Sequence, residues 1–279
     1  MLHNDVVSEI LAHKPEIVPK IFITALQIKP GGYGEGDTIC GTSYPTLRKI
    51  AKAYASISYD ECETLLKNKL HEARFVALII LKHKFSFDMN RVKSLYLDNL
   101  QYVNNWDLVD CSAHHIIGKY ACITGDTSPV YQLANSDNLW KNRISIVATL
   151  ALIKTGNFMP TIELCEKFIN HEHHLIHKAC GWMLREISKC KSRYCCRIYK
   201  GSPRYFQHHE KLCVGMDKKA INYGDYGFLV SVVNAVRPCS KSIARKIAES
   251  CAKEDCSCLI STSGTIPLWL MVFPFGDIK

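Results

Sequence analysis

The sequence predicts an all-α fold in which pairs of helices repeat along the chain. Apolar positions at helical spacing recur from about residue 58, and one helix of each pair begins roughly every 33 to 35 residues, the period of a two-helix solenoid. Pro129 and Pro160 stand in the first turns of predicted helices, where proline is tolerated. No strand-like alternation interrupts this region. The repeat-starting helices are predicted to begin near His71, Trp106, Leu139–Trp140 and His173.

The remaining elements follow from the same patterns. Residues 2 to 28 predict two helices, the second opening at Pro15 and running through Leu26. Residues 30–37 are rich in glycine, but they lack phosphate-loop spacing and no strand precedes them, so we expect a connector. Pro45 begins a basic helix. Between the repeat starts, weaker helices are predicted at 90–103, 128–135 and 160–169.

Composition limits the possible functions. The chain has 279 residues, 47% of them hydrophobic, and a formal net charge of +9, which favours an anionic partner, nucleic acid before a membrane surface. No apolar run is long enough to span a bilayer. The N-terminus has no basic stretch followed by an apolar one, so we expect no secretory signal and an intracellular location, cytoplasmic or in the nucleoid or nucleus. The 14 cysteines are accordingly expected to be reduced thiols.

The segment 104–110 carries the first candidate site. Asn104 or Asn105 can cap a helix that begins near Trp106, with Asp107 in its first turn. Trp106 and Asp110 are four residues apart and share one helix face. An indole and a carboxylate together suit a site that must stabilise a cation. The alternative is a core tryptophan beside a solvated aspartate.

The aligned first helices of the repeats carry further arginines and tryptophans. If these helices line one concave surface, they form a groove for a phosphate backbone, with an aromatic cage around one acid. The alternative is a purely structural pattern. The residues concerned are Arg74, Trp106, Asp110, Trp140, Arg143, Lys178, Trp182 and Arg185.

From about Val6 to Lys189 the chain resembles the AlkD-type DNA alkylation repair proteins, which are built from HEAT-like helical repeats. The resemblance covers about two thirds of the sequence, in family order. The stretches that carry it are Tyr33–Asp37 (YGEGD), His71–Arg74 (HEAR), Asn104–Asp110 (NNWDLVD), Leu139–Arg143 (LWKNR) and His177–Glu186 (HKACGWMLRE).

This resemblance implies a DNA glycosylase that removes N3- and N7-alkylated purines from duplex DNA. The family's essential acid falls on Asp110, its two cleft tryptophans on Trp106 and Trp182, and its cleft arginine on Arg143. Arg185 lies one turn after Trp182 and, with Arg143, would hold flanking phosphates. We expect a monomer that needs no cofactor and no metal, with further DNA contacts from Arg74, Trp140 and Lys178.

Two other functions stay open at this point. A noncatalytic helical scaffold could bind DNA or protein, although it would not need an acid between two groove tryptophans. Zinc is a weaker possibility. The histidines of 171–177 do not follow the metalloprotease pattern, and the eight cysteines from Cys190 onward form no CxxC pair. The pair His114–His115 is expected to be structural.

The last third of the chain departs from this pattern. The sequence predicts a HEAT-like alkylation-repair domain over residues 1–189 and a divergent, poorly ordered, cysteine-rich segment over residues 190–279. The earlier cysteines are scattered singly in helical patterns, among them Cys111, Cys165 and Cys180, and they are expected to pack as small hydrophobic residues.

Overall fold

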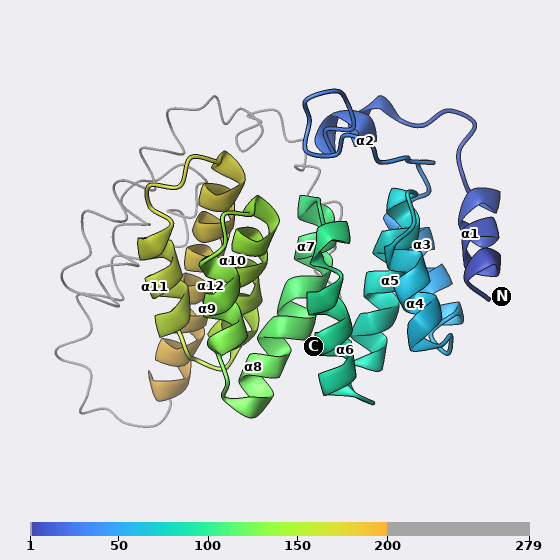
Figure 1. The fold of residues 1–279 in the computed structure, drawn as a ribbon. Helices are drawn as coiled ribbons and strands as arrows, with labels where there is room; N and C mark the ends of the chain where they lie inside the picture. Colours follow the sequence, from blue (N-terminus) through green and yellow to red (C-terminus); the bar gives the residue numbers. More distant parts are fainter. Residues whose placement is uncertain (1, 200–279) are drawn as a thin grey trace. The chain divides into compact units, whose positions relative to one another are not determined.

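A computed structural model describes residues 2–199, which are helical throughout except for loops and one isolated parallel bridge between Thr38 and Leu70. This confirms the predicted all-α class. The helices are α1 Leu2–Ala12, α2 Lys20–Ala25, α3 Tyr44–Ala53, α4 Tyr59–Leu66, α5 His71–Lys84, α6 Met89–Asp98, η1 Leu100–Tyr102, α7 Trp106–Ala113, η2 His114–Gly118, α8 Lys119–Thr124, α9 Ser128–Ala134, α10 Leu139–Lys154, α11 Met159–Lys167 and α12 His174–Tyr199 (Figure 1).

The predicted repeat starts are confirmed. Helices α5, α7 and α10 begin at His71, Trp106 and Leu139, and α12 begins at His174, one residue after the predicted position. The intervening helices α6, α9 and α11 also lie where the pattern places them, and Pro129 and Pro160 occupy first-turn positions. The periodicity is therefore a true structural repeat within the described residues.

The second predicted helix is shorter than expected. It was expected to open at Pro15, but α2 begins only at Lys20, after Pro19 in an extended conformation. Proline disfavours a helical conformation in the residue before it. Pro19 therefore delays the helix, and the segment from His13 to Val18 forms turns and coil.

The described chain divides into two compact units, residues 2–152 and residues 153–199. Helix α12 continues through residue 189 to Tyr199. A domain boundary at residue 189 therefore stays a prediction. The predicted cysteine-rich segment, apart from its first residues in α12, lies outside the described residues.

Helix α5 forms the core of the first unit. All of its residues from His71 to Leu81 are buried, and helices α3, α4, α6 and α7 pack against it (Figure 1). Helix α7 is also buried along its whole length. A helix that is buried all round lacks a polar face, so the polar residues that α5 and α7 do carry must find partners inside the protein.

Helix α7 continues directly into η2, a single π-helical turn, and then into α8. Gly118, the last residue of η2, packs against α10. A Cβ atom built on Gly118 would collide with the backbone carbonyl oxygen of Ala148. The absence of a side chain at position 118 thus permits the close approach of these two helices.

The three cysteines named in the sequence analysis pack as predicted, whereas Cys122 is partly exposed. Cys111, Cys165 and Cys180 are free thiols, and all three are buried, as expected for small hydrophobic residues. Among residues 2–199, no helix combines the length and the apolar character needed to cross a membrane.

Candidate functional site

The site is built around the first turn of α7. Asn105 caps this helix, and its side-chain oxygen accepts a hydrogen bond from the Trp106 backbone N–H at 2.9 Å. The Asn105 amide also donates to the carbonyl of Leu26 at 3.0 Å. This side chain therefore starts the helix and ties it to the end of α2. Of the two asparagines that the sequence offered, Asn105 is the cap.

Asp110 is paired with Arg143 in a two-pronged ion pair. The Arg143 Nε lies 3.0 Å from Asp110 Oδ1, and its terminal nitrogen lies 2.8 Å from Oδ2. Each residue is only 5% exposed. Burial raises the pKa of Asp110, while the adjacent guanidinium opposes that rise. Such parallel N–H···O bonds fix the geometry of an ion pair, so Arg143 holds both oxygens of Asp110 in one orientation.

Three aromatic side chains gather beside this pair. The Trp106 indole N–H donates to the Ala25 carbonyl at 3.0 Å, and the Tyr33 hydroxyl donates to the same oxygen at 2.8 Å. The Tyr33 ring meets the Trp140 ring edge-on, with centroids 5.4 Å apart. Burial raises the pKa of Tyr33 to about 12, although the charge of Arg143 acts in the other direction. We call Tyr33, Trp106 and Trp140 the aromatic cluster.

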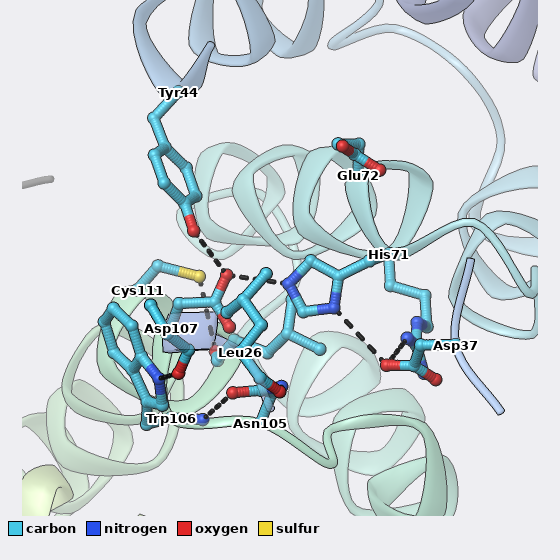
Figure 2. A network of polar contacts seen from close by, with 12 residues as sticks. Leu26, Asp37, Tyr44, His71, Glu72, Asn105, Trp106, Asp107 and Cys111 are labelled. Atoms are coloured by element: carbon cyan, nitrogen blue, oxygen red, sulfur yellow. Dashed lines mark hydrogen bonds and ion pairs between the residues drawn. The ribbon is translucent and has the colours of Figure 1, made fainter. Parts of the chain in front are cut away.

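A second acid on α7 lies deeper. Asp107 is fully buried, and its Oδ2 accepts hydrogen bonds from the Tyr44 hydroxyl at 3.0 Å and from His71 Nε2 at 2.8 Å. The other His71 nitrogen lies 3.5 Å from Asp37 Oδ2. Figure 2 shows these side chains converging from α3, α5, α7 and the loop after α2. We call Asp37, Tyr44, His71 and Asp107 the inner network.

The inner network favours a charged imidazole. Burial alone would lower the pKa of His71, but the charge and hydrogen bond of Asp107 and the hydrogen bond of Asp37 outweigh it and raise the pKa to about 9. Hydrogen bonding from His71 and the charge of Arg74 likewise hold the pKa of Asp37 below its usual value despite burial. His71 is therefore a cation at neutral pH, shared by two carboxylates.

The backbone sets the register of this network. Thr38 N–H donates to the Lys69 carbonyl at 3.0 Å, and His71 N–H donates to the Thr38 carbonyl at 2.8 Å. Glu72 accepts the backbone N–H groups of Cys40 and Gly41 at 3.0 and 2.7 Å. These bonds hold the loop after α2 against the start of α5, which brings Asp37 beside His71.

Arg74 does not occupy the predicted surface position. It is 3% exposed, forms an ion pair with Asp37, and donates to Asn104 Oδ1 at 2.9 Å. The sequence placed it among the DNA contacts because it stands outside the apolar stripe of its helix. The reason for the difference is that α5 is buried on every side from His71 to Leu81, so Arg74 pairs with an internal carboxylate. This arrangement gives the predicted phosphate contact no support.

The predicted residues of the fourth repeat lie in the second unit. Lys178, Trp182 and Arg185 follow one another at four- and three-residue spacing on α12, so they share one face of that helix. Their side chains are partly exposed. The expected position of Trp182 opposite Asp110 stays a prediction, as do the DNA contacts of Lys178 and Arg185.

The histidines before α12 have a structural use. Nδ1 of His171 accepts the backbone N–H of His173 at 3.0 Å, and Nδ1 of His173 accepts that of Leu175 at 3.1 Å. These imidazoles therefore satisfy N–H groups at the start of the helix. Within residues 2–199, no three histidine, cysteine or acidic side chains are grouped as a metal site would require.

Sequence reasoning assigned no role to Tyr33, Asp37, Tyr44 or His71. Tyr33 and Asp37 lie in the glycine-rich segment, which was interpreted as a connector. The structure shows that this connector carries one side chain into the aromatic cluster and another into the inner network. Both residues belong to the YGEGD stretch, which was the available signal that the loop has a purpose.

Comparison with known proteins agrees with this architecture. The sequence profile of the DNA alkylation repair enzyme family matches residues 16–194, a range that contains the aromatic cluster, the inner network, the Asp110–Arg143 pair and most of α12. A search of curated proteins gives no match. Because the family profile covers well over half of the chain, this protein belongs to the DNA alkylation repair enzyme family.

Proposed function

We propose that this protein is a monofunctional DNA glycosylase that removes N3- and N7-alkylated purines from duplex DNA as the first step of base excision repair. The observation that carries the proposal is the Asp110–Arg143 pair. It holds a carboxylate anion at 5% exposure, on the same helix face as Trp106. A fixed anion in a site from which water is largely excluded stabilises positive charge more strongly than it would in solvent.

The chemistry needs such an anion. A purine alkylated at N3 or N7 is cationic, so the electrons of the breaking C1′–N bond neutralise the base as it leaves. The positive charge then passes to the deoxyribose, which becomes oxocarbenium-like, as in glycoside hydrolysis. Asp110 stabilises this sugar, orients the water that attacks C1′, and can accept the proton which that water loses.

Trp106 has a defined part in this proposal. Its indole N–H is engaged by the Ala25 carbonyl, so the ring, and not the N–H, is available to the sugar. The electron-rich face of an indole attracts a cation, which adds to the effect of Asp110. Trp182 is proposed to act in the same way from α12, and Trp140 to support the cluster through its contact with Tyr33.

Arg143 has two proposed uses. Before DNA binds, it keeps Asp110 ionised and oriented. With DNA bound, its guanidinium contacts a phosphate next to the lesion, a contact that positions the duplex without reading its sequence. Arg185 and Lys178 are proposed to make similar contacts from α12. The reaction uses one protein chain and calls for no cofactor and no lysine nucleophile, so the DNA strand stays intact.

The test is release of free base. Full-length protein is incubated with duplex DNA treated with dimethyl sulfate, and released 3-methyladenine and 7-methylguanine are measured by chromatography. Asp110→Asn is expected to lower the rate about 100- to 1000-fold, with DNA binding retained. Asp98→Asn, the same change at an exposed carboxylate on α6, is the matched control. Normal release by Asp110→Asn would contradict the mechanism.

A noncatalytic DNA-binding scaffold is the second candidate. One observation favours it: Arg143 engages both oxygens of Asp110, as a purely structural ion pair would. Tight binding of methylated duplex with no release of base by the wild-type protein would support the scaffold and overturn the glycosylase proposal.

A further inference from the structure

The inner network joins four segments that are far apart in the sequence. Tyr44 begins α3, His71 begins α5, Asp107 lies in the first turn of α7, and Asp37 lies in the loop after α2. Their polar atoms form an unbroken chain from the Tyr44 hydroxyl through Asp107 and His71 to Asp37 (Figure 2). Arg74 extends this chain at its far end through an ion pair with Asp37.

The position of Asp107 links the inner network to the two residues of α7 that the proposed reaction uses. Asp107 directly follows Trp106 and precedes Asp110 by three residues on the same helix. Any rotation or shift of this turn would move both side chains that the proposed reaction uses. The charge of Asp107 also acts on Asp110, because it contributes to the raised pKa of that carboxyl.

We propose that His71 is a positioning residue for this enzyme: through its hydrogen bond to Asp107, it fixes the first turn of α7 and thereby the placement of Trp106 and Asp110. The expected effect of His71 on the excision rate rests on the proposed function, whereas its effect on the position of α7 does not. His71 does not touch the substrate in this proposal, and it acts only through Asp107.

Geometry supports this role over simple packing. The His71 side chain is 2% exposed, and that of Asp107 is completely buried. Two buried groups that face each other at 2.8 Å are costly to separate, because each would lose its compensating charge. The imidazole also bonds through both nitrogens, which sets the orientation of its ring. A side chain whose two nitrogens are both engaged is well suited to orient the Asp107 carboxylate.

The first test separates positioning from stability. His71→Gln keeps one amide donor for Asp107 but cannot bridge to Asp37 as a cation. At a temperature where circular dichroism shows full folding, we expect its single-turnover excision rate to fall about 10-fold or more. Its dissociation constant for undamaged duplex should change less than about twofold. His83→Gln, on an exposed part of the same helix, should match the wild type.

Tyr44→Phe provides a second variant. It removes only the hydroxyl that donates to Asp107, and it keeps the ring that packs against Phe75 with centroids 4.9 Å apart. We expect a smaller loss of rate in the same direction, about two- to fivefold. If His71→Gln does not fold, the excision rate of Tyr44→Phe tests the proposal in its place. A wild-type rate in a fully folded His71→Gln or, failing that, in Tyr44→Phe would overturn the proposal.

The pH dependence gives a readout that does not depend on catalysis. His71 is acted on by Asp107 of α7, Asp37 of the loop and Arg74 of its own helix, and the Tyr44 hydroxyl of α3 bonds to the same Asp107 oxygen. The pKa of His71 is raised from 6.5 to about 9. Its contribution to stability is therefore fully present below pH 6.5 and is lost as the pH rises through about 9. The melting temperature of the wild type should fall over this range, and that of His71→Gln should fall less.

The Trp106 indole N–H reports on position directly. This N–H donates to the Ala25 carbonyl, so a movement of α7 changes that hydrogen bond and shifts the indole proton resonance. We expect the shift near pH 9 in the wild type, as His71 deprotonates, but not in His71→Gln. If the wild type releases no base and yet shows this shift, the glycosylase proposal fails while the positioning of α7 stands. An indole resonance that is unchanged both by pH and by the His71→Gln substitution would overturn the positioning proposal itself.

Discussion

The two carboxylates of α7 are three residues apart and have different surroundings. Asp107 is fully buried and receives hydrogen bonds from two neighbouring helices through Tyr44 and His71. Asp110 is 5% exposed and is held by one residue, Arg143 of α10. An acid that is enclosed by several elements can hold a fold together. An acid that is slightly exposed and has one such partner can exchange that partner for a ligand, so the number of partners separates the structural carboxylate from the proposed catalytic one.

The largest expected effect on stability comes from the deeper acid. Asp107→Asn removes the charge opposite His71, and breaking a buried pair of this kind costs roughly 3 kcal/mol or more. For a chain of this size, the melting temperature should fall by roughly 10 °C. Asp110→Asn should cost less, because the pair it breaks lies nearer to solvent. Thermal denaturation of both variants, followed by circular dichroism, checks the order, and a larger loss in Asp110→Asn would reverse the comparison.

A smaller effect is expected when the partner of Asp110 is changed. Arg143→Lys keeps the positive charge but loses the two-pronged geometry, so we expect about 10-fold weaker binding of methylated duplex with its salt dependence kept. Arg143→Ala should weaken binding further and reduce the salt slope by about one. Fluorescence anisotropy at several salt concentrations measures both. An unchanged slope in Arg143→Ala would mean that Arg143 makes no phosphate contact.

The smallest effect is expected in the aromatic cluster. Tyr33→Phe removes the hydroxyl that donates to Ala25 and leaves the ring contact with Trp140. The lost hydrogen bond should cost about 1 kcal/mol, since Trp106 still donates to the same carbonyl. A melting curve and the excision rate test this together. A rate that falls as far as in Asp110→Asn would show that the tyrosine hydroxyl takes part in the reaction.

Most of the fold could be predicted because it depends on local patterns. Apolar spacing, first-turn prolines and the cap before Trp106 act within a few residues, and they located the repeat helices closely. Pro19 shows the limit of such patterns. The helical spacing of apolar residues continues from Pro15 through Leu26, but the helix itself begins only after Pro19. Burial on all sides of α5 was also beyond these patterns, and it places Arg74 inside the protein.

The contacts of the candidate site depend on packing between distant segments. Asp110 and Arg143 are 33 residues apart, and His71 and Asp107 are 36 apart. Each spacing is close to one repeat, so opposite charges at matching positions of neighbouring repeats were a signal that could have predicted both pairs. The role of Asp37 was less accessible, because it depends on how the loop after α2 bridges to α5.

The contact at Gly118 has a consequence for which substitutions the Asp110–Arg143 pair tolerates elsewhere in the sequence. Arg143 is carried by α10, the helix that Gly118 lets approach the continuation of α7. Any larger residue at 118 would push the two helices apart and pull the guanidinium away from its acid, although neither member of that pair had been altered. The geometry of the Asp110–Arg143 pair thus depends on a position that has no side chain, and a substitution there would disturb the pair without changing either of its members.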